Sequence, residues 1–293
     1  MFPTAKYRLV KEKLQGEPRL FRHLRLAEPA AASEKDVLRV HQESYLDKLK
    51  FGKLSYEEIL TLEIPYSKEL YESAILCCGG TICAAESALK NKAAVHLGGG
   101  FHHAFPDHGE GFCVLNDIAV AVKKLKAERR IKKALIIDCD LHQGNGTAFI
   151  FRGDKSVFTF SMHQEQNYPF YKPQSDMDIG LRDRVKDFEY LEHLENHVPK
   201  IISDFRPQLI IYVAGADPYE NDQIGNLSLT IDGLRKRDLF VYGQARNYGI
   251  PVAAVLAGGY AIDQDDTVMI HYNTVASAVE VFCGEGKMLS RKS

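Results

Sequence analysis

The sequence lacks the features that mark several large classes of protein. It has 293 residues with no tryptophan, and 37 Lys and Arg residues are balanced by 39 Asp and Glu residues, for a formal charge of −2. Without a basic excess there is no electrostatic field to hold a phosphate backbone, so nucleic acid is not expected as a direct ligand. The longest apolar runs, such as 209–214, have the length of a strand and are too short to cross a bilayer.

The sequence also lacks the marks of secretion and of a structural zinc ribbon. Its first residues contain no apolar core of a secretory signal. The six cysteines fall in helix-like or strand-like contexts, and no two matched CxxC pairs occur. We therefore expect reduced thiols and a cytoplasmic location, with no membrane attachment.

What is present is a regular alternation of short apolar strands and longer helices. Continuous apolar runs are typical of strands that are covered on both faces of a parallel sheet. They predict strands at 93–97, 134–138, 157–161, 209–214 and 252–256, and helices are predicted at 67–90, 114–128, 188–205, 232–248 and 266–282. No repeat or linker divides the chain, so we expect residues 1–293 to form a single α/β domain around a central, mainly parallel sheet.

Polar residues follow four of these strands, at the point where each strand ends. In open parallel sheets, ligands bind outside the carboxyl ends of the strands. We therefore expect these side chains to meet at one edge of the sheet: His102, His103, Asp140, His142, Asp217 and Tyr260.

Asp140, His142 and Asp217 are candidate metal ligands. The first two are two positions apart, so in extended geometry their side chains would point the same way. One imidazole and two carboxylates leave coordination positions open, as catalytic zinc sites do. The alternative is a capped strand-to-helix turn whose polar groups satisfy backbone donors.

His102 and His103 also have two interpretations. A histidine pair in a surface loop is usually without function, but the glycines before this pair let the backbone approach a site closely. Beside a metal, one imidazole would serve as a general base and the other as a cationic or proton-donating partner. Each would need an acceptor on its other nitrogen, for which Asp138 and Asn145 are suitably placed.

Tyr260 is the last of the candidates. It is either a buried aromatic residue with a satisfied hydroxyl group or a hydrogen-bond donor to a developing oxyanion. Its position beside the other strand ends favours the second interpretation.

Five motifs occur in order along the chain: Gly98-Gly99-Gly100-Phe101-His102-His103-Ala104, Gly111-Phe112-Cys113-Val114-Leu115-Asn116-Asp117, Ile137-Asp138-Cys139-Asp140-Leu141-His142-Gln143-Gly144-Asn145-Gly146-Thr147, Gly215-Ala216-Asp217 and Gly258-Gly259-Tyr260. Together they resemble the zinc-dependent histone deacetylase family, over about residues 2–283. Gln143, where many members have a second histidine, is most similar to the class IV branch and its bacterial relatives. The resemblance implies an arginase/deacetylase-like fold and a histone deacetylase-like catalytic domain.

The resemblance implies a role for each catalytic candidate. His103 would be the general base and then the acid toward the leaving amine, with His102 as its electrostatic partner. Asp138 would orient His102, and Asn145 would orient His103. Tyr260 would donate to the tetrahedral oxyanion.

The resemblance also implies metals and a substrate tunnel. One catalytic Zn²⁺ would be bound by Asp140, His142 and Asp217. A structural K⁺ would be bound by Asp138, Asp140 and His142, with Ser161 and Met162 as further positions. The tunnel for the acylated side chain would have walls at Gly111, Phe112, Tyr168 and Ile224.

Two departures from the family pattern have consequences. Asn145 stands where some members have Asp, so a neutral amide would hold the base and raise its pKa less. Members commonly have a further segment with a first strand before the position where this chain begins, so we expect either a misassigned start site or a sheet that lacks an edge or inner strand.

The leading hypothesis is a zinc-dependent amidohydrolase that removes acetyl or longer acyl groups from lysine side chains of proteins. One alternative is a deacetylase of small acylated amines such as acylpolyamines, for which Glu165, Asp176 and Asp178 would form an anionic tunnel mouth. A further alternative is a non-catalytic protein that binds acyl-lysine. Nothing in the sequence indicates an oligomeric state.

Overall fold

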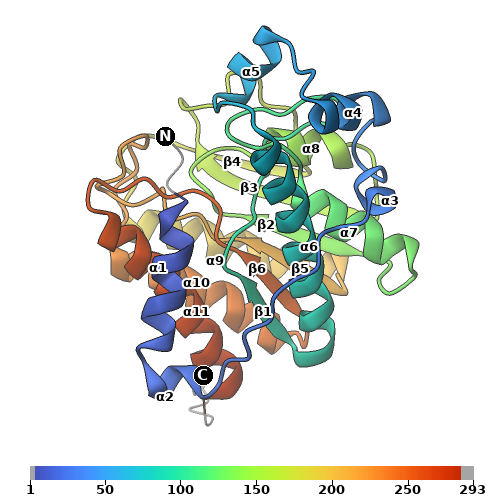
Figure 1. Ribbon diagram of the computed structural model, residues 1–293. Coiled ribbons are helices and arrows are strands. Elements are labelled where there is room, and N and C mark those ends of the chain that lie inside the picture. The colour runs from blue at the N-terminus through green and yellow to red at the C-terminus, as the bar shows by residue number, and fades with distance from the viewer. Residues whose placement is uncertain (1–3, 285–293) are drawn as a thin grey trace.

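The computed structural model describes residues 4–284, which fold around one six-stranded sheet (Figure 1). Every strand pairing is parallel, and the strand order is β1-β6-β5-β2-β3-β4. The strands are β1 (Ala93–His96), β2 (Ala134–Asp138), β3 (Val157–Gln164), β4 (Met177–Leu181), β5 (Leu209–Val213) and β6 (Val252–Val255). The predicted α/β class with a parallel sheet is thus confirmed.

Helices connect these strands and cover the sheet. They are α1 (Ala5–Gln15), α2 (Pro18–Phe21), α3 (Glu34–Val37), α4 (Glu43–Phe51), α5 (Tyr56–Leu62), α6 (Lys68–Asn91), α7 (Asp117–Ala127), α8 (Asn145–Phe151), α9 (Asp187–Phe205), α10 (Ile231–Asn247) and α11 (Gln264–Cys283). Side-chain caps begin several of them, since Ser67, Asn116 and Thr230 each accept a hydrogen bond from a backbone N–H in the first turn of α6, α7 and α10.

Alternate residues of each central strand face opposite layers of helices. Ile136 and Ile211 pack with α6 and α7 in one buried cluster. Their neighbours Ile137 and Tyr212 pack with α9, α10 and α11 in a second cluster. Figure 1 shows α6 and α7 on one side of the sheet and α10 and α11 on the other. Because both faces are covered, these strands appear in the sequence as continuous apolar runs.

All five predicted strands and all five predicted helices are present, within a few residues of the expected ends. Two kinds of element were missed. Strand β4 lies at the edge of the sheet, and its residues alternate between half-buried and exposed up to Leu181. The short helices α2 to α5 and α8, together with α1, lie outside the strand–helix alternation on which the prediction rested.

The strand order reverses between β2 and β5. From β2 the chain continues outward through β3 and β4, whereas from β5 it continues to β6 on the other side. The loops that follow β2 and β5 therefore leave the sheet in opposite directions. At such a switch point a crevice opens outside the carboxyl ends of the two strands, and this is where open α/β sheets bind ligands.

A buried arginine side chain forms hydrogen bonds with the backbone of both loops. The Arg237 side chain is fully buried, and its Nη1 donates to the backbone oxygens of Gly215, at 2.7 Å, and Cys139, at 3.3 Å. Asp238 accepts hydrogen bonds from the same guanidinium group and from Thr274. Arg237 thus joins the segments that carry the polar residues after β2 and β5.

Three further predictions concern membrane crossing, the cysteines and the start of the chain. No helix among residues 4–284 has both the length and the apolar character that a membrane crossing requires. All six cysteines lie among the described residues and are free, as expected. Residues 1–3 and 285–293, which include the start at which a missing strand was expected, lie outside the described residues.

Replacing Arg237 by Met is expected to lower the free energy of unfolding by about 3–5 kcal/mol, because it leaves Asp238 as an uncompensated buried charge. Urea unfolding monitored by circular dichroism measures this loss. The matched control is Arg235→Met, since Arg235 forms an exposed ion pair with Glu280, and its loss costs at most about 1 kcal/mol. Equal losses in the two variants would contradict this role of Arg237.

Candidate active site

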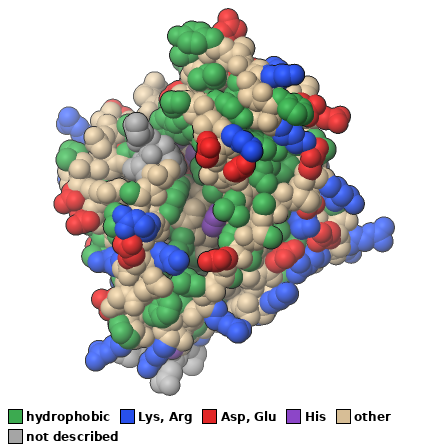
Figure 2. Space-filling view, in the orientation of Figure 1, with side chains coloured by type: hydrophobic (Ala, Val, Ile, Leu, Met, Phe, Trp, Pro, Cys, Tyr) green, Lys and Arg blue, Asp and Glu red, His purple; other side chains and the backbone are tan. Residues whose placement is uncertain are grey.

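A cavity of about 200 Å³ opens at the carboxyl ends of β1, β2, β5 and β6. Residues that follow all four strands line it: Gly99 to His103, Asp140, His142, Asp217, Ala257, Gly258 and Tyr260. Figure 2 shows histidine side chains in a hollow near the middle of the face viewed there, with positive and negative side chains interspersed around it. The six candidate residues are therefore brought together at one edge of the sheet.

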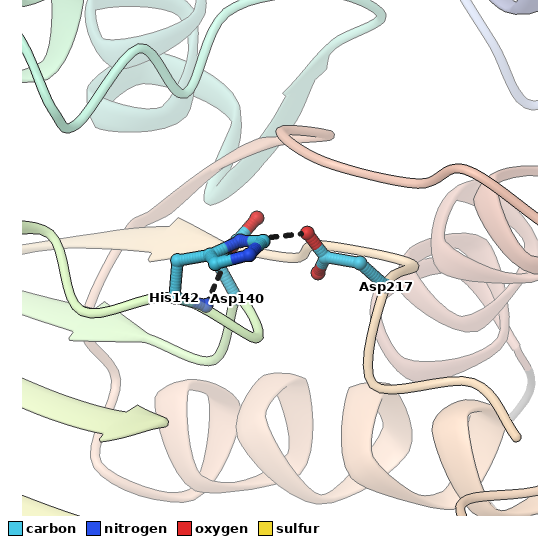
Figure 3. A group of neighbouring side chains, drawn as sticks. All are labelled: Asp140, His142 and Asp217. Atoms are coloured by element: carbon cyan, nitrogen blue, oxygen red, sulfur yellow. Dashed lines mark hydrogen bonds and ion pairs between the residues drawn. The ribbon is translucent and has the colours of Figure 1, made fainter. Parts of the chain in front are cut away.

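Asp140, His142 and Asp217 form a buried group in which one potential ligand atom of each residue lies within 4.8 Å of the others (Figure 3). His142 Nδ1 is 3.3 Å from Asp140 Oδ1 and 3.4 Å from Asp217 Oδ2. The extended geometry predicted for Asp140 and His142 is wrong, because β2 already ends at Asp138. Instead, Asp140 Oδ1 accepts a hydrogen bond from the His142 backbone N–H, and this Asx-type turn brings the two side chains together.

One carboxylate oxygen of this group is buried without a hydrogen bond. Asp217 Oδ1 accepts from the backbone N–H of Leu141, but Oδ2 has no hydrogen-bond partner. A side chain at Gly258 would bring its Cβ to 2.0 Å from Oδ2, so only glycine leaves this space open. An orphaned carboxylate oxygen in a preserved space fits a cation, and a donor set of two carboxylates and one imidazole suits a divalent metal.

The charges of the group also favour a cation. Burial alone would lower the pKa of His142, but its hydrogen bond with Asp140 and charge attraction from Asp140 and Asp217 raise it to about 10. The same imidazole and His102 hold the pKa of Asp140 well below its usual range, in spite of burial. Without a bound ion, a protonated His142 thus compensates the two carboxylates, and a metal would replace that proton.

His102 pairs with Asp138 behind the metal group. His102 Nδ1 lies 2.8 Å from Asp138 Oδ2, and both side chains are buried. Burial would lower the pKa of His102, but Asp138 and Asp140 raise it to about 9. This imidazole therefore carries a positive charge near neutral pH.

His103 has the opposite character. Its Nδ1 lies 2.7 Å from Asn145 Oδ1, and its Nε2 is 3.1 Å from His102 Nε2. Burial and the charges of His102 and His142 hold the pKa of His103 well below its usual range. A neutral imidazole beside a cationic one provides a proton acceptor with an adjacent positive charge.

Tyr260 is held in the cavity wall by its backbone. Asp222 Oδ2 accepts a 2.7 Å hydrogen bond from the Tyr260 N–H, and Gln223 donates to the Tyr260 carbonyl. Burial and the charges of Asp217 and Asp140 raise the pKa of Tyr260 well above its usual value. The hydroxyl therefore stays protonated and can donate a hydrogen bond.

The predicted tunnel residues Gly111, Phe112, Tyr168 and Ile224 all line the cavity. Gly111 has a positive φ of 53°, and a Cβ there would lie 2.8 Å from the Tyr168 hydroxyl and 3.0 Å from the His103 ring. The narrow wall therefore requires glycine. The Phe112 and Tyr260 rings both line the cavity, and their centroids lie 6.1 Å apart.

Of the residues proposed for potassium, Asp140 and His142 line the cavity, whereas Asp138, Ser161 and Met162 are not among its lining residues. Ser161 pairs with Asp138 in the register of β2 and β3, and Met162 is the next residue of β3. The Ser161 hydroxyl lies 3.0 Å from His163 Nδ1. The register brings the predicted residues of the two strands together, and the ion itself stays a prediction.

The acidic residues suggested for the mouth do not line the cavity. Asp176 accepts from Thr159, and Asp178 accepts from Gln143 and Ser175. Glu165 packs against Gly180. These contacts involve β3, β4 and the residues between them. Because none of the three acidic residues lines the cavity, the interpretation of them as mouth residues is wrong.

Sequence reasoning missed three acidic residues that contribute to the site. Glu63, which ends α5 with a positive φ, lines the cavity. Glu110 contacts Asn145 and Tyr168, and Asp222 holds the Tyr260 backbone. Only Glu110 carried a local signal, because it directly precedes the Gly111-Phe112 motif.

Comparison with known proteins agrees with the resemblance that the sequence motifs indicate. A model of the histone deacetylase domain matches residues 1–275. An uncharacterized protein of Picosynechococcus sp. is 37% identical over 281 residues, which are 96% of this chain and 93% of the relative. Histone deacetylase 2 of Arabidopsis thaliana is 33% identical over 80% of this chain and 63% of the relative. Acetoin utilization protein AcuC of Bacillus subtilis is 32% identical over 80% of this chain and 66% of the relative, so the match spans less than two thirds of the length of these two proteins.

Replacing Asp217 by Ala is expected to weaken binding of a divalent metal at least about 100-fold, because the change removes a ligand rather than a group that only supports one. Isothermal titration of metal-free protein with Zn²⁺ measures the affinity and the stoichiometry, which should be one ion per chain in the unaltered protein. Asp176→Ala serves as the control, since this acidic side chain lies away from the cavity. Unchanged affinity in Asp217→Ala would exclude this group as the metal site.

Proposed function

Since the chain belongs to the histone deacetylase family, we propose that it is a zinc-dependent deacylase that hydrolyses the amide bond between an acyl group and a lysine side chain of a protein or peptide. One observation carries the proposal: a possible metal group, a neutral and a cationic imidazole and a protonated tyrosine line a single cavity. The cavity has glycine and aromatic walls that suit a narrow aliphatic chain.

Zn²⁺ would be held by Asp140, His142 and Asp217. When bound, it would supply Lewis acidity that polarises the acyl carbonyl group and lowers the pKa of a water molecule. The orphaned Asp217 oxygen supports this assignment. The potassium ion at Asp138 and Ser161 remains part of the proposal.

His103 would act as the base in the first step and as the acid in the second. Its Nδ1 faces the Asn145 carbonyl oxygen, so the proton resides on Nδ1, and the Nε2 lone pair lies 3.1 Å from the Nε2 of the cationic His102. Nε2 would accept a proton from the attacking water as the water oxygen bonds to the carbonyl carbon. The same proton would then pass to the amine nitrogen as the C–N bond breaks, which returns His103 to its neutral state.

His102 and Tyr260 would stabilise the charge that develops on the carbonyl oxygen and nearby atoms. His102 is held in its cationic form by Asp138 and supplies a fixed positive charge beside His103. The Tyr260 hydroxyl would donate a hydrogen bond to the oxygen as it becomes an oxyanion. Its raised pKa supports this donor role, because a tyrosinate could not donate.

A specific observation favours a second candidate substrate, a small acylated polyamine. Glu63 lines the cavity, and no lysine or arginine is among the residues that line it within the described chain. Partial burial and the charge of Glu110 raise the pKa of Glu63, so a cation bound beside it would stabilise the carboxylate. A polyamine carries such a second cation along its chain, whereas an acyl-lysine does not.

The remaining features of the proposal come from the sequence. We propose that residues 1–293 act as one catalytic domain in the cytoplasm, with acylated lysine or a small acylated amine as substrate. The described residues support the domain assignment through one continuous sheet. The oligomeric state stays open.

His103→Ala is expected to lower kcat for an acetyl-lysine peptide by about 10²- to 10⁴-fold, because it removes the proton acceptor. Bound zinc, measured by mass spectrometry of the purified protein, should be unchanged. His193→Ala, on helix α9 away from the cavity, is the control and should keep full activity. No turnover by the zinc-loaded unaltered protein with any acyl length would refute the proposed function.

Glu63→Gln distinguishes the two substrate classes. It is expected to lower kcat/KM for an acetylated polyamine up to about fivefold, because a partly exposed ion pair contributes at most about 1 kcal/mol. The value for an acetyl-lysine peptide with neutral flanking residues should not change, and Glu165→Gln should affect neither substrate. An equal loss for both substrates would remove the support for a polyamine site.

A further inference from the structure

We propose that Glu110 is a positioning residue that selects the tautomer of His103 through the side-chain amide of Asn145. The inference rests on the proposed function, because it concerns the base of the same reaction. It assigns a role to a carboxylate that does not touch the reacting atoms.

Three side chains form a continuous hydrogen-bonded chain from the base outward. His103 Nδ1 lies 2.7 Å from Asn145 Oδ1, and Asn145 Nδ2 donates to Glu110 Oε1 at 2.8 Å. Asn145 is almost fully buried, with 1% of its surface exposed. Its amide therefore has one partner on each side and little access to solvent.

The carboxylate determines which way the Asn145 amide faces. A carboxylate oxygen only accepts hydrogen bonds, so the amide NH₂ must point toward Glu110 and the amide oxygen toward His103. With the opposite orientation, Asn145 Oδ1 would face Glu110 Oε1 with no proton between the two acceptors, which is costly for buried groups. The amide oxygen in turn requires a proton on His103 Nδ1, so Nε2 is the unprotonated nitrogen, which also matches its 3.1 Å contact with Nε2 of the cationic His102.

Glu110 is held as an anion by its other contacts. Burial raises its pKa, but hydrogen bonds from His108, Tyr168 and Asn145 outweigh burial and lower the pKa below its usual value. The Tyr168 hydroxyl donates to the same Oε1 atom at 2.8 Å. The Tyr168 ring lies edge-on to the His103 ring, with 5.0 Å between the ring centroids. One carboxylate thus fixes the cavity wall and the base together.

The backbone of Glu110 has a separate structural role. Its N–H and carbonyl group pair with Cys113 across a tight turn. A change in the side chain leaves both of these backbone bonds intact, so the turn and the positioning role can be tested separately.

The first test is Glu110→Met, which keeps the side-chain length and removes the acceptor. With the metal-loaded enzyme and an acetyl-lysine peptide, kcat is expected to fall at least about tenfold, since loss of the correct tautomer can cost up to about 10⁴-fold in other hydrolases. KM reports separately on the Tyr168 wall, which loses its hydrogen-bond acceptor in this variant. Asp107→Ala, an exposed acidic neighbour in the same loop, is the control and should keep full activity.

The second test exchanges the amide and the carboxylate. Asn145→Asp alone places two carboxylates in contact and should lower kcat, because like charges at this distance repel. In the double variant Asn145→Asp with Glu110→Gln, the glutamine amide can donate to the new carboxylate, and kcat should recover most of the loss. A double variant no more active than Asn145→Asp would overturn the inference.

The third test does not depend on activity. In metal-loaded protein with ¹⁵N-labelled histidine, the His103 signals, identified by their absence in His103→Ala, report which ring nitrogen carries the proton. The unaltered protein should show a protonated Nδ1, and Glu110→Met should shift the population toward a protonated Nε2. An unchanged tautomer in Glu110→Met would overturn the inference even if kcat falls. If the unaltered protein turns over no acyl substrate, the proposed function fails, and the tautomer measurement still decides the role of Glu110.

Discussion

The structure depends on placing two carboxylates, Asp140 and Asp217, next to each other away from water. Burial of one unpaired carboxylate is costly, and two at this distance also repel each other. Backbone N–H groups offset part of this cost, since Gly258 donates to Asp140 and Leu141 donates to Asp217. The remaining cost requires positive charge beside both carboxylates, which a protonated His142 or a bound metal ion would supply. The structural requirement for positive charge thus arises at the place where the proposed metal would bind.

The topology of the sheet provides that place. The loops after β2 and β5 diverge at the strand-order reversal. The buried Arg237, on α10, donates hydrogen bonds to a backbone carbonyl group of each loop. The first helix adds a second cation, because the buried Lys6 ammonium donates to the Ala257 carbonyl in the loop after β6. Burial lowers the pKa of Lys6 to about 8, although the nearby carboxylates Asp217 and Asp140 oppose this shift. Segments far apart in the sequence therefore supply the charges that surround one crevice.

The sequence could predict those parts of the molecule whose signal is local. The runs Ala134–Asp138 and Leu209–Val213 are apolar because helices cover both faces, so their continuous pattern predicts buried parallel strands. The polar residues at their ends follow from the same rule. Strand β4 was missed because it lies at the edge and carries no such run. The mouth residues were misjudged because Asp176 and Asp178 are engaged by Thr159 and Gln143, and no pattern along the chain reveals contacts of that kind.

The negative charge that orients His103 lies on Glu110, one side chain farther from the base than an aspartate at position 145 would be. The edge of the sheet already holds buried carboxylates at Asp138, Asp140 and Asp217, against the cationic His102. A fourth carboxylate at position 145 would be almost fully desolvated, whereas the Glu110 side chain keeps 19% of its surface exposed. With a neutral amide between them, the carboxylate still orients His103 but adds little repulsion to the metal group, because Coulomb energy falls with distance and solvent screens the exposed oxygen. The amide at Asn145 therefore separates two tasks, orientation of the base and supply of negative charge, that one aspartate would have to combine.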